Sequence, residues 1–314
     1  MSDVLPPGDT PAICYSGYRK GQSPRKGIYP SYDEIHQDLL LLAPRWRLLR
    51  LYDPTPHAET VLKVIRDEGL DMKVMLGLEL AAELNNPKCP WGADFTEEQL
   101  VANRKNNDEE VERAIDMANR YSDLVFAVSA GNEATVEWTD HLVPVERVRA
   151  FVRRLRKSVN QPLTFCENYV PWVHDLRELA EELDFLSVHS YPIWEQQTVD
   201  HALVYTQANH GSVQSAFPHK PVIITEAGWT TGSNGRGIEP WNANEDLQAL
   251  YVRELTDWAT EAGILTFVFE AFDEPWKGSE DPMEPEKHWG LYFEDRTPKK
   301  VVDVLSPAPA AAVE

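Results

Sequence analysis

Two glutamates of this chain each end a short apolar stretch and have a glycine two residues away. Glu133 closes the segment 126–133 (FAVSAGNE), and Glu226 lies within the segment 222–229 (VIITEAGW). A buried strand has little use for a charge at its end unless that charge faces a cleft. Two such carboxylates can divide the work of a hydrolase, one delivering a proton and the other attacking carbon or activating water. Glu133 and Glu226 are therefore the candidate catalytic pair.

Other short apolar runs, bounded by turn residues, recur along the chain and predict strands. They are continuous rather than alternating, which is typical of parallel strands covered on both faces. The predicted strands are Ile13–Ser16, Leu48–Tyr52, Lys73–Leu78, Leu124–Ser129, Leu163–Cys166, Phe185–His189, Val222–Thr225 and Thr266–Phe269.

Stretches with helical periodicity lie between these strands. Ser31 and Thr96 each begin a capping pattern, with Glu34 and Gln99 three residues later. The predicted helical segments are Ile35–Leu42, 96–121, Pro144–Val159, Asp175–Leu183, Val199–Ala216 and Asn244–Ala262.

Alternating strands and helices, with eight strands in total, predict a (β/α)8 TIM barrel. The chain has 314 residues, which is enough for one such barrel with its loops. We expect a single catalytic domain at residues 13–305, an N-terminal extension at 1–12 and a disordered tail at 306–314. In this fold the active site lies at the carboxyl ends of the strands, where Glu133 and Glu226 are both placed.

Composition narrows the range of partners. A formal net charge of −21 argues against nucleic acid and against anionic membranes. The histidines show no metal-site spacing, so we expect no metal and no cofactor. The N-terminus lacks the features of a signal peptide, which predicts a cytoplasmic protein, or a periplasmic or extracellular one if a leader was removed from this chain. The sequence gives no oligomeric state.

Six short motifs occur in order along the chain. They are 14–17 (CYSG), 50–52 (RLY), 131–133 (GNE), 189–192 (HSYP), 225–229 (TEAGW) and 269–277 (FEAFDEPWK). Together they resemble glycoside hydrolase family 17, the barrels that act on β-1,3-glucan, in their bacterial and fungal branches. The resemblance covers nearly the whole chain and depends on the motifs occurring in this order.

The resemblance implies roles for individual residues. It makes Glu133 the acid/base and Glu226 the nucleophile of a retaining double displacement. Asn132 matches a residue that contacts the sugar 2-hydroxyl, and Tyr191 matches one that orients the nucleophile. Glu274 and Lys277 match a supporting glutamate and lysine, and Asp273 stands where plant members carry asparagine. The predicted substrate-binding residues are Tyr15, Tyr52, His189, Trp229, Asp273 and Trp276.

The predicted function is hydrolysis of β-1,3-linked gluco-oligosaccharides or glucan. A β-1,3-glucanosyltransferase would use the same residues with a sugar in place of water. Two further hypotheses stay open: a non-catalytic β-glucan-binding protein, and a retaining barrel that acts on β-1,4 or β-mannosidic links. Isolated strand-end glutamates such as Glu79, Glu167 and Glu270 are interpreted as structural.

Overall fold

The computed structural model describes residues 5–305, so the predicted disordered tail at 306–314 lies outside the described residues. The first strand begins at Ala12, which the sequence analysis had assigned to the N-terminal extension. None of the helices in residues 5–305 combines the length and apolar character needed to cross a bilayer.

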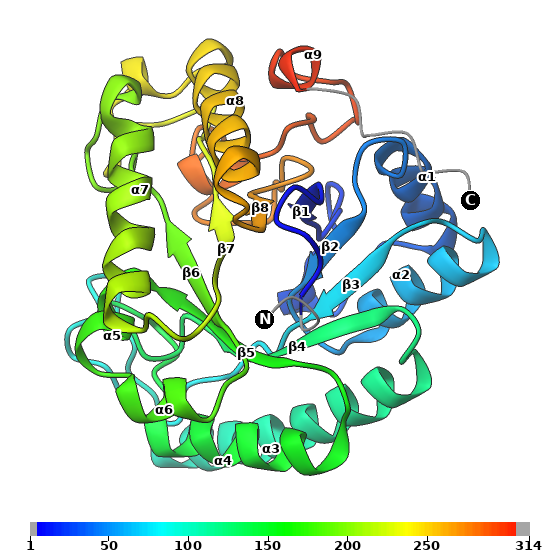
Figure 1. Cartoon of the computed structure of the whole chain (residues 1–314), viewed down its shortest axis with the longest axis vertical. Coiled ribbons are helices and arrows are strands. Elements are labelled where there is room, and N and C mark those ends of the chain that lie inside the picture. The colour runs from blue at the N-terminus through cyan, green and yellow to red at the C-terminus, as the bar shows by residue number, and fades with distance from the viewer. Residues whose placement is uncertain (1–4, 306–314) are drawn as a thin grey trace.

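Within residues 5–305, eight parallel strands form a closed barrel, and helices surround it (Figure 1). Each strand pairs with its neighbours in chain order, and the last strand pairs with the first. The predicted (β/α)8 barrel is therefore confirmed. The strands are β1 (Ala12–Cys14), β2 (Leu48–Leu51), β3 (Lys73–Leu76), β4 (Val125–Asn132), β5 (Leu163–Asn168), β6 (Leu186–Ser190), β7 (Val222–Ala227) and β8 (Thr266–Val268).

The helices follow the strands in the expected alternation. They are α1 (Tyr32–Leu42), α2 (Pro56–Asp67), α3 (Glu97–Arg120), α4 (Val145–Ser158), α5 (Tyr169–His174), α6 (Arg177–Glu181), α7 (Val199–Ala216), α8 (Glu245–Ala262) and α9 (Val301–Val304). Three short 3-10 helices, Pro24–Lys26, Pro240–Asn242 and Pro285–Lys287, lie in loops of the described chain.

Two helix starts confirm their sequence signals. The Ser31 side chain accepts from the backbone N–H of Glu34, and the Glu34 carboxylate accepts from the N–H of Ser31. Thr96 and Gln99 make the same reciprocal pair at the start of α3. Each pair satisfies two backbone donors that have no partner inside the helix.

Two helical segments differ from the prediction. No helix was predicted between β2 and β3, where α2 begins with Pro56 in its first turn and buries Val61, Leu62 and Ile65. The predicted segment Asp175–Leu183 contains only α6, and α5 precedes it because the side chain of Asn168 accepts from the N–H of Val170 and caps a separate short helix.

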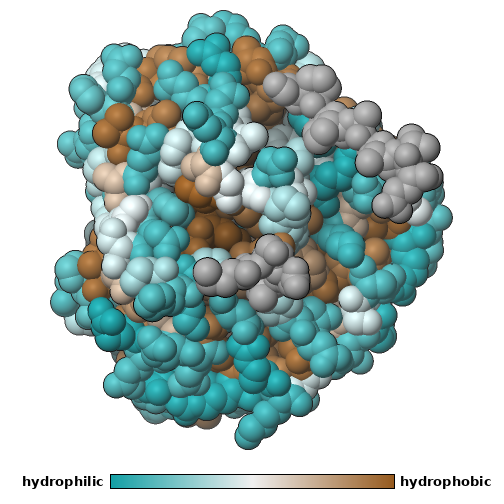
Figure 2. Space-filling model, viewed as in Figure 1, coloured by the Kyte–Doolittle hydropathy of each residue, from teal (hydrophilic) through white to brown (hydrophobic). Residues whose placement is uncertain are grey.

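Apolar side chains fill the barrel and the layer between strands and helices. β1, β2, β5, β6, β7 and β8 are buried along their whole length. Figure 2 shows hydrophilic residues around the periphery of the visible face and hydrophobic residues gathered towards its middle, where the strands lie. The core thus holds the strand ends in fixed positions.

The strand pairing is irregular near the ends that carry the predicted site. The register shifts between Ser129 and Asn132 where β4 pairs with β5, and between Val188 and His189 where β6 pairs with β7. Such irregularities bend a strand locally and change the direction of its side chains. They occur just before the polar residues that the sequence analysis assigned to the site.

Candidate active site

Glu133 follows the last residue of β4 and is partly exposed. Its backbone has φ of 43°, in the left-handed region, and its N–H donates to the carbonyl of Cys166 at 2.9 Å. A Cβ on the preceding Gly131 would lie 2.7 Å from Cε2 of Phe165. The chain can therefore turn here only with glycine beside Phe165.

Glu226 lies in β7, opposite His189 of β6, and its side chain is only 7% exposed. A Cβ on Gly228, two residues later, would lie 2.1 Å from the carbonyl oxygen of Phe269. The glycine thus lets β7 leave the barrel against the end of β8. Gly131 thus leaves room for the ring of Phe165, and Gly228 for the backbone of Phe269.

The carboxylate of Glu226 accepts from three side chains. Arg50 donates to Oε1, and the Tyr52 hydroxyl donates to the same oxygen at 3.0 Å. The Tyr191 hydroxyl donates to Oε2 at 2.5 Å. Burial disfavours the ionised carboxylate, but the charges of His189 and Arg50 and the bond from Tyr191 outweigh it and lower the pKa of Glu226 to about 2. Glu226 is ionised at neutral pH.

Arg50 is the residue that the sequence analysis left out of the site. It is 2% exposed, and its Nη2 donates to Oδ1 of Asn132 at 2.5 Å. It thus joins Glu226 to Asn132, which precedes Glu133. The sequence does contain a signal for Arg50, because a charged residue inside the apolar run 48–51 (LLRL) requires a buried partner.

Asn132 is held at both its side chain and its backbone. Its carbonyl accepts from Nε2 of His141 at 2.9 Å, and Nδ1 of His141 lies 2.7 Å from Asp140. Burial disfavours the charged ring, but Asp140 and Glu79 outweigh it and raise the pKa of His141 to about 9. Because Arg50 occupies Oδ1, the amide nitrogen of Asn132 is left as a donor.

His189 was predicted to bind substrate, but its side chain is fully buried. Its Nδ1 lies 2.8 Å from Oε1 of Glu133 and 3.5 Å from Oε2 of Glu226. The histidine therefore contacts both candidate catalytic carboxylates, and it has no surface to offer a sugar.

Three other predicted substrate-binding residues are also buried and bound to the protein. The Tyr15 hydroxyl donates to Asp38 at 3.1 Å, and Trp229 Nε1 donates to the carbonyl of Asn242 at 2.8 Å. Asp273 accepts from Lys299 at 2.6 Å and from the N–H of Gly290. Proximity to a strand end does not decide whether a side chain turns into the mouth or behind it, and direct sugar contact stays a prediction for these three.

Glu274 and Lys277 form a cluster with Glu270, which follows β8. The Lys277 ammonium lies 2.7 Å from Glu270 and 2.9 Å from Glu274. The three side chains are mostly buried, and Glu274 also accepts from the backbone N–H of Tyr18 at 3.3 Å. The ion pair between Lys277 and Glu270 agrees with the interpretation of Glu270 as a structural residue. The cluster supports the end of β8 and the loop after β1.

Trp276 and Tyr52 remain partly exposed at this end of the barrel. The Trp276 ring meets Tyr18 edge to face at 5.9 Å, and its buried Nε1 has no hydrogen-bond partner in the described residues. Among the other strand-end glutamates, Glu167 accepts from both the N–H and the hydroxyl of Thr135. Burial, followed by the charge of Glu133, raises the pKa of Glu167 to about 7.

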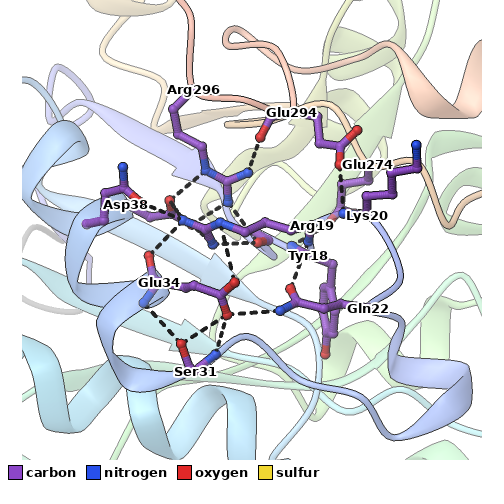
Figure 3. A network of polar contacts seen from close by, with 12 residues as sticks. Tyr18, Arg19, Lys20, Gln22, Ser31, Glu34, Asp38, Glu274, Glu294 and Arg296 are labelled. Carbon is purple, nitrogen blue, oxygen red and sulfur yellow. Dashed lines mark hydrogen bonds and ion pairs between the residues drawn. The ribbon is translucent and has the colours of Figure 1, made fainter.

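The loop after β1 is fixed by a polar network, which Figure 3 shows from close by. Buried Asp38 of α1 accepts from Arg19 of this loop at 2.9 Å and from Arg296 of the loop before α9 at 2.7 Å. The backbone N–H of Lys20 donates to Glu294 at 2.7 Å. The network joins the loops that follow the first and last strands, and it thereby places Tyr18 beside Trp276.

Among the described residues, one group of histidine and acidic side chains is compact enough to surround a metal ion. It consists of Glu133, His189 and Glu226, with one atom of each within 4.8 Å of the others. In this structure Nδ1 of His189 faces both carboxylates, and the Arg50 guanidinium already occupies Glu226. We interpret the group as a set of hydrogen-bonded catalytic side chains.

Known proteins are similar to this chain over most of its length. A family model described as the BtgE/BtgC glycoside hydrolase domain matches residues 12–290. A putative glucan endo-1,3-beta-glucosidase, btgC, of Aspergillus niger is 24% identical over 299 residues, covering 88% of this chain but 40% of that protein. The chain thus spans about two fifths of the length of this curated relative.

Solved structures show the same barrel. An endo-laminarinase from Formosa Hel1_33_131 superimposes with a TM-score of 0.80 and 28% identity, over 96% of this chain and 87% of that one. An active-site mutant of a Rhizomucor miehei beta-1,3-glucanosyltransferase, in complex with laminaritriose, gives a TM-score of 0.73 at 21% identity, over 96% and 98% of the two chains. At 21% identity, the similarity to this second structure supports the fold only.

Proposed function

Because the chain belongs to the BtgE/BtgC glycoside hydrolase family, we propose that it cleaves β-1,3-linked glucan with retention of configuration, with Glu133 as acid/base and Glu226 as nucleophile. One observation carries the mechanism: an oxygen of Glu133 and an oxygen of Glu226 lie within 4.8 Å of each other. Retaining enzymes keep their carboxyl groups about 5 Å apart, whereas inverting enzymes separate them by roughly 6.5–9.5 Å to admit water.

In the first step, an oxygen of Glu226 forms a bond to the anomeric carbon while the glycosidic C–O bond breaks. The bonding electrons go to the leaving oxygen, which takes a proton from Glu133. The lowered pKa of Glu226 supports its role as attacking group, since it is ionised across the range in which an acid/base can hold a proton.

In the second step, water attacks the anomeric carbon and gives a proton to Glu133, and the bond to Glu226 breaks to restore both groups. Asn132 supports the transition state in each step, because Arg50 holds its oxygen and leaves its amide N–H groups for the sugar 2-hydroxyl. Arg50 and Tyr191 fix Glu226 in place, which lowers the cost of orienting it.

The linkage is inferred from the relatives. The curated relative from Aspergillus niger is named a glucan endo-1,3-beta-glucosidase, and the 28% identical structure is an endo-laminarinase. A neutral glucan also suits a chain with a net charge of −21, which would repel an anionic polysaccharide.

The test is to incubate the pure protein with laminari-oligosaccharides labelled at the reducing end and to resolve the products by length. Cello-oligosaccharides serve as the linkage control and Glu226→Ala as the inactive control. Shorter products alone support hydrolysis, and longer products indicate transfer to a second glucan chain. Activity confined to the cello series contradicts the linkage. If wild type cleaves no more substrate than Glu226→Ala, the result favours a glucan-binding protein without catalytic activity.

Proton NMR of the first product formed from unlabelled laminarihexaose tests the stereochemistry. A new reducing end that appears first as the β-anomer supports retention. The α-anomer appearing first contradicts the proposed double displacement, even if cleavage occurs.

A further inference from the structure

His189 of β6 makes contacts that the catalytic roles of Glu133 and Glu226 do not explain. It is fully buried, its Nδ1 lies 2.8 Å from Oε1 of Glu133, and the same nitrogen lies 3.5 Å from Oε2 of Glu226. The ionised Glu226 oxygen cannot donate, so the hydrogen between it and Nδ1 belongs to the nitrogen. Nδ1 is therefore the donor, and its nearer acceptor is Glu133.

The groups around the ring come from several strands. Glu133 follows β4, Cys166 lies in β5 and Glu226 in β7, while Arg50 of β2 is bound to Glu226 on its other side. Burial disfavours the charged ring, but Glu226, Cys166 and Glu133 together outweigh it and raise the pKa of His189 to about 10. In turn Arg50 and His189 outweigh burial at Cys166 and lower the pKa of its thiol to about 7.

We infer that His189 is a positioning residue that reserves Oε1 of Glu133 as a hydrogen-bond acceptor, so that the catalytic proton sits on Oε2, and that this bond persists while Glu226 is covalently bound to sugar. This inference rests on the proposed function. The histidine neither touches the sugar nor transfers a proton. It decides which oxygen of the acid/base faces the leaving group.

The electrostatics differ between the two steps. Before the first step the imidazolium has one ionised neighbour, Glu226, and a protonated Glu133. Once Glu226 is esterified its charge is gone, and Glu133 must be ionised to take a proton from water. The cation then has Glu133 as its ionised partner. The ring thus faces one ionised carboxylate in each step, Glu226 together with Arg50 in the first and Glu133 in the second, without any movement of the ring.

Two substitutions separate the hydrogen bond from the charge. His189→Asn places an amide N–H near the position of Nδ1 but carries no charge, whereas His189→Ala removes both. We expect His189→Ala to lose about 100-fold or more in kcat with little change in KM, and His189→Asn to stay within about 10-fold of wild type. Removing the positive charge makes loss of the proton from Glu133 less favourable. In His189→Asn the alkaline limb of the kcat/KM profile should therefore move to higher pH.

His210→Asn is the matched control. This second buried histidine, on α7, bonds the carbonyl of Val222 at 3.1 Å and lies outside the site. Its replacement should cost stability and leave the pH profile unchanged. A purely structural role for His189 predicts that His189→Asn also loses stability and keeps the wild-type pH profile. That result would overturn the inference. An equal loss of kcat in His189→Asn and His189→Ala would overturn it as well.

A measurement on the free protein separates this inference from the proposed function. Nitrogen-15 NMR of labelled histidine, assigned by the signal lost in His189→Asn, should show Nδ1 protonated at neutral pH. A ring protonated only at Nε2 contradicts the inference, whatever the enzyme cleaves. An inactive wild type with Nδ1 protonated would count against the proposed function and leave the hydrogen bond established.

Discussion

Arg50 and Glu226 form an ion pair across the barrel, between strands β2 and β7, with side chains only 2% and 7% exposed. The same guanidinium donates to Asn132, so one arginine fixes both the proposed nucleophile, Glu226, and the residue that precedes the proposed acid/base, Glu133. Removing one partner of a buried pair leaves the other charge uncompensated. The site is therefore sensitive to Arg50 in a way that motif comparison of the glutamates alone does not suggest.

Arg50→Lys should reduce kcat by about 100-fold, since a single ammonium cannot replace two directed guanidinium donors. The pKa of Glu226 should also rise, so the acid limb of the kcat profile should move to higher pH. Steady-state kinetics on laminarihexaose between pH 3 and 9 checks both effects. A variant with wild-type kcat and an unmoved acid limb would contradict the role given to Arg50.

Glu226 should stabilise the fold in a defined pH window. Its pKa is about 2 in the folded protein, whereas an unperturbed glutamate titrates near about 4.3. The folded pKa is the lower one, so the stabilising contribution is complete above the unfolded pKa and is lost as pH falls towards 2. Urea unfolding of wild type and Glu226→Gln should therefore show a difference in free energy that shrinks between pH 5 and 2. A difference that grows on acidification would reverse the assigned sign.

Gly228→Ala should destabilise the protein by about 3 kcal/mol or more, because the added methyl would meet the carbonyl oxygen of Phe269 and neither backbone can move freely. Gly211→Ala is the control. Gly211 lies in α7 with open space around a Cβ, so alanine there should stabilise by up to about 1 kcal/mol. Urea denaturation measures both, and equal effects would contradict the close approach of β7 to β8.

Trp276 and Trp229 should separate substrate binding from stability. Trp276 is partly exposed, so Trp276→Ala should raise KM about 3- to 10-fold with little loss of stability. Trp229 is buried and donates to Asn242, so Trp229→Phe should cost about 1–3 kcal/mol and leave KM unchanged. Kinetics and thermal unfolding check both variants. A raised KM with unchanged stability in Trp229→Phe would support Trp229 as a sugar-binding residue.

Asp38→Asn should destabilise the protein by about 3–5 kcal/mol, because Asp38 is fully buried and accepts from Arg19, Arg296 and Tyr15. Asp33→Asn, on the exposed face of the same helix, should cost less than about 1 kcal/mol. Urea unfolding compares the two. Similar losses would show that the network in Figure 3 adds little.

The sequence was a good guide to features that repeat or that have a local cause. The strand count follows from apolar runs, and the helix starts at Ser31 and Thr96 follow from capping pairs. The positions of Glu133 and Glu226 follow from strands that end in a charge beside glycine. Each signal lies within a few residues, so no knowledge of distant contacts was needed.

The directions of individual side chains could not be read in this way. Tyr15, His189 and Trp229 all lie at strand ends, yet their partners are Asp38, Glu133 and Asn242, which come from other elements. Register shifts near β4 and β6 change which side chain points into the mouth, and no residue type signals them. The charge of Arg50 inside an apolar run indicates a buried partner, but the sequence does not identify that partner, because Asn132 and Glu226 are far away along the chain.

The contacts of Arg296 and Lys299 determine how far the catalytic unit extends. The family match ends at residue 290, yet Arg296 reaches back 258 positions to Asp38, and buried Lys299 holds Asp273. A polypeptide cut at the family boundary would lack both cations, so Asp38 would keep only Arg19 as an ion-pair partner and buried Asp273 would lose the ammonium of Lys299. A fragment made for expression, or for transfer of this barrel into another protein, should therefore include the residues up to about 305.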